Sequence, residues 1–212
     1  MSWKKLDIVA GHRKYVDFDK DEIYYFMEYT ARKGYSHGTA NNLISNLKMG
    51  PCQSPSRLKY RERAISVFSS NLRCFLSKAK VDVGITWVPP SQAPDDPKYD
   101  DRIVRAVNTS CVGLQYLHPM DIIFTKKTRA RLHFDEFERD PIALAETYGW
   151  RDVDLNGVRV LIIVDDVLTQ GTNFRAMADT IRGAYPNIHV VGMIWAITVW
   201  EEESYFDPIN DE

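Results

Sequence analysis

The residues with the clearest chemical potential lie in one short stretch, where two carboxylates precede a polar loop that contains glycine. Asp165 and Asp166 follow the aliphatic run 160–164, and Thr169 and Gly171 come a few residues later. Loop N–H groups and the positive end of a following helix can together hold a phosphate. Adjacent carboxylates can accept hydrogen bonds from vicinal hydroxyls or hold Mg²⁺-bound water. A sugar phosphate fits this combination of groups.

This stretch resembles the signature of the type I phosphoribosyltransferases, in which an aliphatic strand leads into two acidic residues, two variable residues and a Thr-Thr-Gly loop. Gln170 stands where the second threonine is usual, and Asn173 stands where the last one is. The resemblance implies that the chain binds phosphoribosyl pyrophosphate, with Asp165 and Asp166 holding Mg²⁺. The residues that it assigns to ligand binding here are Asp165, Asp166, Val167, Leu168, Thr169, Gln170, Gly171, Thr172 and Asn173.

Two further segments are candidates for contact with a pyrophosphate group. A strand over residues 83–88 ends at consecutive prolines, and this proline-rich loop is most similar to the ComF-type, competence-associated branch, which implies ligand contacts from Pro90 and Ser91. A strand terminator without a ligand is the alternative. The charged stretch 125–140 occupies the place of the family's flexible loop, so Lys126 and Arg129 are catalytic candidates, because positive charge stabilises a leaving pyrophosphate. A solvated charged hairpin is the alternative there.

Two other interpretations of the acidic stretch exist. The acidic strand end of a P-loop nucleotidase also follows an aliphatic run, but it requires a G-x-x-x-x-G-K-[ST] loop, which the sequence lacks. A buried strand with an ordinary acidic turn would be favoured if the glycine loop were absent. The five histidines show no metal-ligand spacing, so nothing suggests zinc.

The elements that must position these groups alternate between strand and helix. A strand over 158–164, aliphatic except at Arg159, leads through the acidic loop into a helix over 173–184 and a strand over 188–198. A helix over 102–114 and a strand over 121–124 precede them. This order predicts an α/β fold with a doubly wound parallel sheet, whose ligands bind beyond the carboxyl ends of the strands.

The first 80 residues are predicted to be helical, with helices from Asp19 to Gly34, from Ser36 to about Leu47, and over 57–80. We therefore expect two units: an N-terminal helical region over 1–80, which could act as a hood that sets acceptor specificity, and a phosphoribosyltransferase-like domain over 81–212. The basic residues of 57–80 alternate with apolar ones, as on a core-facing helix with a solvated side.

Composition limits the alternatives further. With 27 basic and 29 acidic residues, the chain of 212 has a net charge of −2, which gives no global attraction to nucleic acid. Three separated cysteines indicate a reducing compartment. No apolar run reaches the length of a membrane span, so a cytoplasmic protein without membrane contact is expected.

Two functions follow from the resemblance. The first is a glycosyltransferase of nucleotide metabolism that moves the phosphoribosyl group to an unknown nitrogenous acceptor. The second is a non-catalytic regulatory or effector protein that senses phosphoribosyl pyrophosphate or a related nucleotide and acts through a partner. A protein partner for the N-terminal helical region and a homo-oligomer are left open, and no general base can be assigned.

Overall fold

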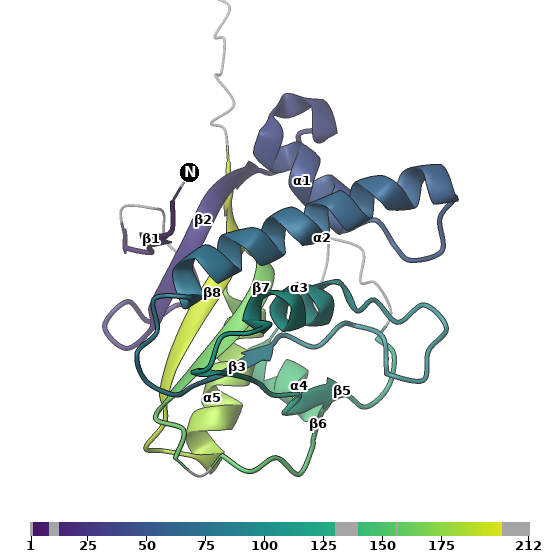
Figure 1. Cartoon of the computed structure of the whole chain (residues 1–212). Coiled ribbons are helices and arrows are strands. Elements are labelled where there is room, and N and C mark those ends of the chain that lie inside the picture. The colour runs from purple at the N-terminus through teal and green to yellow at the C-terminus, as the bar shows by residue number, and fades with distance from the viewer. Residues whose placement is uncertain (1, 9–12, 130–139, 156, 201–212) are drawn as a thin grey trace, which may run out of the picture.

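A computed structural model describes residues 2–8, 13–129, 140–155 and 157–200 (Figure 1). Its centre is a six-stranded sheet in the order β1-β2-β8-β7-β3-β4. Strand β1 runs antiparallel to β2, and every other neighbouring pair is parallel. The strands are β1 (Lys4–Lys5), β2 (Glu22–Thr30), β3 (Val83–Trp87), β4 (Leu117–Pro119), β7 (Val160–Leu168) and β8 (His189–Val199).

Helices cover both faces of this sheet, because its central strands are apolar on both sides. The first face carries α1 (Thr39–Leu47), α2 (Pro55–Leu76) and α3 (Arg102–Cys111). The second carries α4 (Pro141–Glu146) and α5 (Thr172–Ala184), and Figure 1 shows α2 and α5 on opposite sides. The predicted α/β fold with a mostly parallel, doubly covered sheet is confirmed.

Strand β7 is longer than predicted. The prediction ended it at Val164, but it continues to Leu168, because β8 supplies partners along the whole length and pairs Leu168 with Ile197. Asp165 and Asp166 therefore lie within a paired strand instead of after it. Successive side chains on a strand point to opposite faces, so the two carboxylates face different layers of helices.

The helix predicted from Asp19 to Gly34 is wrong. Residues Glu22–Thr30 form β2, which pairs with β8 inside the central sheet. The segment is rich in aromatic residues, and Ile23, Tyr25 and Met27 are buried at alternate positions, which is the period of a strand. The predicted helices of α1 and α2 are confirmed. The first 80 residues thus contribute helices and also a strand of the main sheet.

The four short elements between α3 and β7 differ from the prediction. The predicted strand over 121–124 is largely β5 (Ile123–Thr125), which pairs with β6 (Tyr148–Trp150) in a separate two-stranded sheet. The strand that extends the central sheet is β4, only three residues long and ending in proline, so its sequence carries little strand signal. Helix α4 was not predicted.

The order of connections defines one special edge of the sheet. From β3 the chain passes through α3 to β4 on one side, and it later returns to β7 on the other side of β3. In open α/β sheets, ligands bind at the carboxyl ends of the strands where the winding reverses in this way. Here that point lies between the ends of β3 and β7, which is where the predicted site residues lie.

Candidate functional site

Asp166 faces the layer of α1 and α3 and is held there by two cations. Its Oδ2 accepts hydrogen bonds from Nη2 and Nε of Arg102, at 2.8 and 3.2 Å, and its Oδ1 lies 3.6 Å from Nζ of Lys48. Asp166 is only 5% exposed. Burial opposes its ionisation, but Lys48 and Arg102 outweigh it and hold the pKa of Asp166 below its usual value. The carboxylate is therefore charged at neutral pH.

Arg102 also belongs to a longer chain of alternating charges, which we call the Arg102 network. Its guanidinium donates to Asp100, whose Oδ1 lies 2.6 Å from Nη2 of the buried Arg61. The sequence of charges is Lys48, Asp166, Arg102, Asp100 and Arg61. None of the other four members of this network was predicted as a site residue. They come from α2, the end of α1, the loop before α3 and the first residue of α3, and no local pattern links those segments.

Asp165 has a different environment on the α5 face. Its Oδ2 is 3.4 Å from Nδ2 of Asn173 in the first turn of α5, and its Oδ1 accepts the backbone N–H of Asp166 at 2.8 Å. It is 4% exposed. Burial, followed by the charge of Asp166, raises the pKa of Asp165 to about 7. Asp165 is therefore partly protonated at neutral pH, whereas Asp166 is not.

The loop that follows β7 leads directly into α5. Gly171 has φ of 88°, in the left-handed region that favours glycine, and α5 begins at the next residue. Within the described part of the chain, the backbone N–H groups of residues 170–173 donate no hydrogen bond. Four free N–H groups at the positive end of a 13-residue helix are suited to a phosphate. The ligand-binding role of Val167, Leu168, Thr169, Gln170, Gly171, Thr172 and Asn173 stays a prediction.

An N-terminal segment, residues 13–16, contacts the other side of this loop. The buried Arg13 donates to the carbonyl oxygens of Thr169 and Thr198, at 2.8 and 2.7 Å, and Tyr15 N–H donates to the carbonyl of Gln170 at 2.9 Å. A Cβ on Gly171 would lie 2.8 Å from Cγ2 of Val16. The absence of a side chain at Gly171 thus allows Val16 to pack closely against the loop. The sequence did not predict this contact.

The proline loop after β3 contacts the charged segment that begins at Thr125. Thr125 donates its hydroxyl to the carbonyl of Pro90 at 2.6 Å, and Arg129 N–H donates to the carbonyl of Ser91 at 2.8 Å. Lys126 Nζ, however, donates to the carbonyl of Glu146 at 3.1 Å, at the end of α4. Arg131 and the remainder of 130–139 lie outside the described residues. The ligand-binding and catalytic roles of Pro90, Ser91, Lys126 and Arg129 stay predictions.

The carboxylates can be assessed as Mg²⁺ ligands from their donor atoms. Within the described residues no group of three or more His, Cys, Asp or Glu could hold a metal ion. Mg²⁺ in phosphate sites is commonly held by one or two carboxylates together with the phosphates of the ligand and water. Asp165 fits this limited role, because among the described residues its oxygens accept hydrogen bonds only from Asn173 and a backbone N–H. The oxygens of Asp166 are already used by Arg102 and Lys48.

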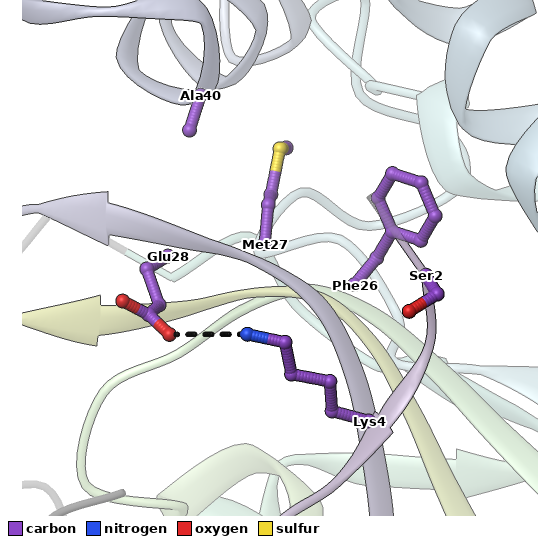
Figure 2. A pocket seen from close by; sticks show the side chains of 6 residues that line it. All are labelled: Ser2, Lys4, Phe26, Met27, Glu28 and Ala40. Carbon is purple, nitrogen blue, oxygen red and sulfur yellow. Dashed lines mark ion pairs between the residues drawn. The ribbon is translucent and has the colours of Figure 1, made fainter.

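A hollow lies away from these residues, beside β1, β2 and α1 (Figure 2). It measures about 340 Å³, and its lining is mainly apolar around Phe26 and Met27. The only ion pair among the residues drawn joins Lys4 to Glu28 at 3.7 Å. None of its lining residues belongs to the site between β3 and β7, and it offers no group of polar atoms that converge on one ligand.

Comparisons with known proteins give limited information. No protein-family model and no curated protein matches the chain. One similar solved structure is a Helicobacter pylori xanthine-guanine-hypoxanthine phosphoribosyltransferase, with 8% identity, a TM-score of 0.36, and coverage of 68% of this chain and 87% of that one. Another is a Trypanosoma brucei adenine phosphoribosyl transferase, with 9% identity, a TM-score of 0.34 and 90% coverage of both chains. At these scores neither likeness supports a functional argument, and the ComF-type branch stays a prediction.

No described helix has both the length and the apolar character that a bilayer span requires.

Proposed function

We propose that this chain is a phosphoribosyltransferase-like protein that binds phosphoribosyl pyrophosphate, with Mg²⁺ carried by the ligand, at the edge of the sheet between β3 and β7. One observation carries the proposal. At the point where the winding of the sheet reverses, a buried carboxylate pair lies beside four backbone N–H groups at the start of α5 that have no acceptor among the described residues. A ligand with hydroxyls and a phosphate satisfies both sets of groups.

The charges around the pair support an anionic ligand. Lys48 and Arg102 lie directly against Asp166, and the chain segment with Lys126 and Arg129 contacts the loop after β3. Lys48 and Arg102 place positive charge at this edge, and preorganised positive charge stabilises a leaving pyrophosphate. In a transferase, the protein would then act mainly through positioning and electrostatics, as a nitrogen nucleophile displaces pyrophosphate at the anomeric carbon.

A second function is favoured by the bonds of Asp166. Lys48 comes from the end of α1, in the region predicted as a hood, and a ligand that uses Asp166 must compete with it. Such competition would transmit ligand binding to α1 without any chemistry. A sensor that signals through the N-terminal helices to a protein partner is therefore the second candidate. Nucleotide ligands, a homo-oligomer and a cytoplasmic location stay predictions for both functions.

Isothermal titration calorimetry tests the shared step. Wild type and the Asp165→Asn/Asp166→Asn double variant are titrated with phosphoribosyl pyrophosphate in the presence of Mg²⁺. We expect the double variant to bind at least about tenfold more weakly, which corresponds to about 1.4 kcal/mol. The control is Asp82→Asn, an exposed carboxylate at the opposite end of β3 that pairs with His118 and should leave the affinity unchanged.

Equal affinity of the double variant and wild type would contradict the proposal. If binding is confirmed, a screen of nitrogenous acceptors for pyrophosphate release separates the two functions. A transferase releases pyrophosphate with one acceptor or more, whereas a sensor binds the ligand and releases none.

A further inference from the structure

Two buried hydroxyl groups in this protein lack hydrogen-bond partners within the described residues. They are the phenol of Tyr148, which is 3% exposed, and the hydroxyl of Thr86, which is 1% exposed. A buried hydroxyl without a partner loses its bonds to water and gains nothing in return. Native proteins contain few such groups, and each one calls for a bound water, a ligand or a catalytic role.

Thr86 points to the same face of the sheet as Asp165. In β3, Ile85 and Trp87 pack into the core beneath α2, so Thr86 between them faces the α5 layer. In β7, Leu161 and Ile163 pack into the core on the α5 side, and Asp165 continues this alternation. The bond from Asn173 of α5 to Asp165 agrees with that direction. Thr86 pairs in register with Ile163, which is two residues before Asp165 in β7. Thr86 therefore lies beside the residue that precedes Asp165 on the same face of the sheet.

Tyr148 reaches the same region from a different element. It lies in β6 opposite Thr125, whose hydroxyl is bonded to the proline loop after β3. Its ring packs into the core on the α5 side, and the guanidinium of Arg129 lies 5.8 Å from the ring centre. Burial raises the pKa of Tyr148, Arg129 opposes this, and the charge of Asp165 raises it further, which agrees with a phenol near that carboxylate. Tyr148 thus stays neutral and able to donate.

We propose that the hydroxyls of Tyr148 and Thr86 complete a subsite with Asp165 that recognises the hydroxyl-bearing sugar portion of the ligand rather than its phosphates. The inference rests on the proposed function and assigns it two further binding residues. Neutral hydroxyls both donate and accept, as sugar hydroxyls do, and Asp165 supplies an acceptor beside them. A phosphate would instead be matched by cations and backbone N–H groups, which lie at the start of α5 and around Asp166.

The test compares three substitutions that each remove a hydroxyl, which Tyr→Phe deletes and Thr→Val replaces with a methyl group. Tyr148→Phe and Thr86→Val change the subsite, and Tyr24→Phe is the control, because its phenol donates to Glu22 at 2.7 Å in β2. Each variant is titrated with ribose 5-phosphate, 2-deoxyribose 5-phosphate and inorganic pyrophosphate, and its unliganded melting temperature is measured. Asp165→Asn is titrated in parallel.

We expect Tyr148→Phe and Thr86→Val to bind ribose 5-phosphate about tenfold more weakly and pyrophosphate as wild type does. They should also discriminate less between ribose and 2-deoxyribose 5-phosphate. The melting temperature of Tyr148→Phe should stay level or rise, because no bond is lost in the unliganded protein. Tyr24→Phe should melt earlier, since it loses a bond, and should keep its affinity.

Two results overturn the inference and leave the proposed function intact. One is unchanged sugar phosphate affinity in Tyr148→Phe and Thr86→Val while Asp165→Asn binds weakly. The other is a lower melting temperature of Tyr148→Phe with unchanged affinity, which would show that an internal water satisfies the phenol. If wild type binds neither the sugar phosphates nor phosphoribosyl pyrophosphate, the inference and the proposed function fail together.

Discussion

Replacement of Arg102 by methionine should destabilise the protein more than any change to its surface ion pairs. The guanidinium is the shared partner of Asp100 and Asp166, and both carboxylates are buried. Removal of one member of a buried pair leaves an uncompensated charge and costs about 3–5 kcal/mol. Lys48 cannot compensate, because it is 46% exposed and 3.6 Å away, where an ion pair contributes about 0–1 kcal/mol. Asp100 retains Arg61, so we expect a loss of about 3 kcal/mol.

Urea unfolding followed by tryptophan fluorescence at neutral pH without metal measures this loss. The control is Arg105→Met, because Arg105 pairs with Glu62 on the surface, where the two side chains are 39% and 47% exposed. That pair should contribute no more than about 1 kcal/mol. Arg102→Lys provides a milder change, since it keeps the charge and loses the forked geometry, and it should fall between wild type and Arg102→Met.

A double-mutant cycle isolates the contact itself. Asp166→Asn should cost less in the Arg102→Met background than in wild type, with a coupling energy of about 1–3 kcal/mol. Two results would refute the reasoning. One is an Arg102→Met variant that loses no more free energy than Arg105→Met. The other is additive losses in the double variant, which would mean that Arg102 and Asp166 do not interact.

Three further predictions concern the acidic strand and its loop. Burial raises the pKa of Asp165 to about 7, so the folded state retains a proton that the unfolded chain releases near pH 4. Metal-free wild type should therefore lose stability relative to Asp165→Asn between about pH 4 and 7. Urea unfolding across that range measures this, and parallel stability curves for the two proteins would contradict it. Gly171→Ala should lower the free energy of unfolding by about 1–2 kcal/mol, because of the positive φ and the contact with Val16. Gly183→Ala in α5 has open space around the new Cβ and should raise it by about 0.5–1 kcal/mol. Thermal unfolding of both variants checks this order. Arg13→Met should lower the free energy of unfolding, measured with urea, by about 2–3 kcal/mol, because two carbonyl groups lose a charged donor. An unchanged unfolding midpoint would show that segment 13–16 does not stabilise the loop.

The sequence predicted the elements whose pattern is local. Strand β8, helix α5 and the loop between β7 and α5 follow from aliphatic runs, helical spacing and one glycine. Strand β2 was missed because its aromatic residues also fit a helical period, and only its partner β8, more than 160 residues later, decides between the two. Pairing across such distances is not encoded in the spacing of neighbouring residues.

The same limit applies to the site. Thr169 to Asn173 could be predicted because their chemistry depends on a short turn at the start of a helix. The partner of Asp166 could not, since Arg102 is separated from it by 64 residues and reaches it only after α3 has packed on the sheet. Tyr148 and Thr86 carry no motif at all. They stand out only in the folded structure, where their buried hydroxyl groups have no hydrogen-bond partner among the described residues.

The strand geometry gives the two adjacent carboxylates different roles. Because β7 continues past them, Asp166 is turned into the layer of α1 and α3, where Arg102 and Lys48 keep it charged and link it to the fold. Asp165 is turned toward α5, where burial raises its pKa and no cation of the described residues is bonded to it. A group with spare hydrogen-bonding capacity at the carboxyl end of a central strand is the one that a ligand can use. Under the proposed function, Asp165 is therefore the carboxylate expected to contact the ligand, whereas Asp166 is held by its ion pairs with Arg102 and Lys48.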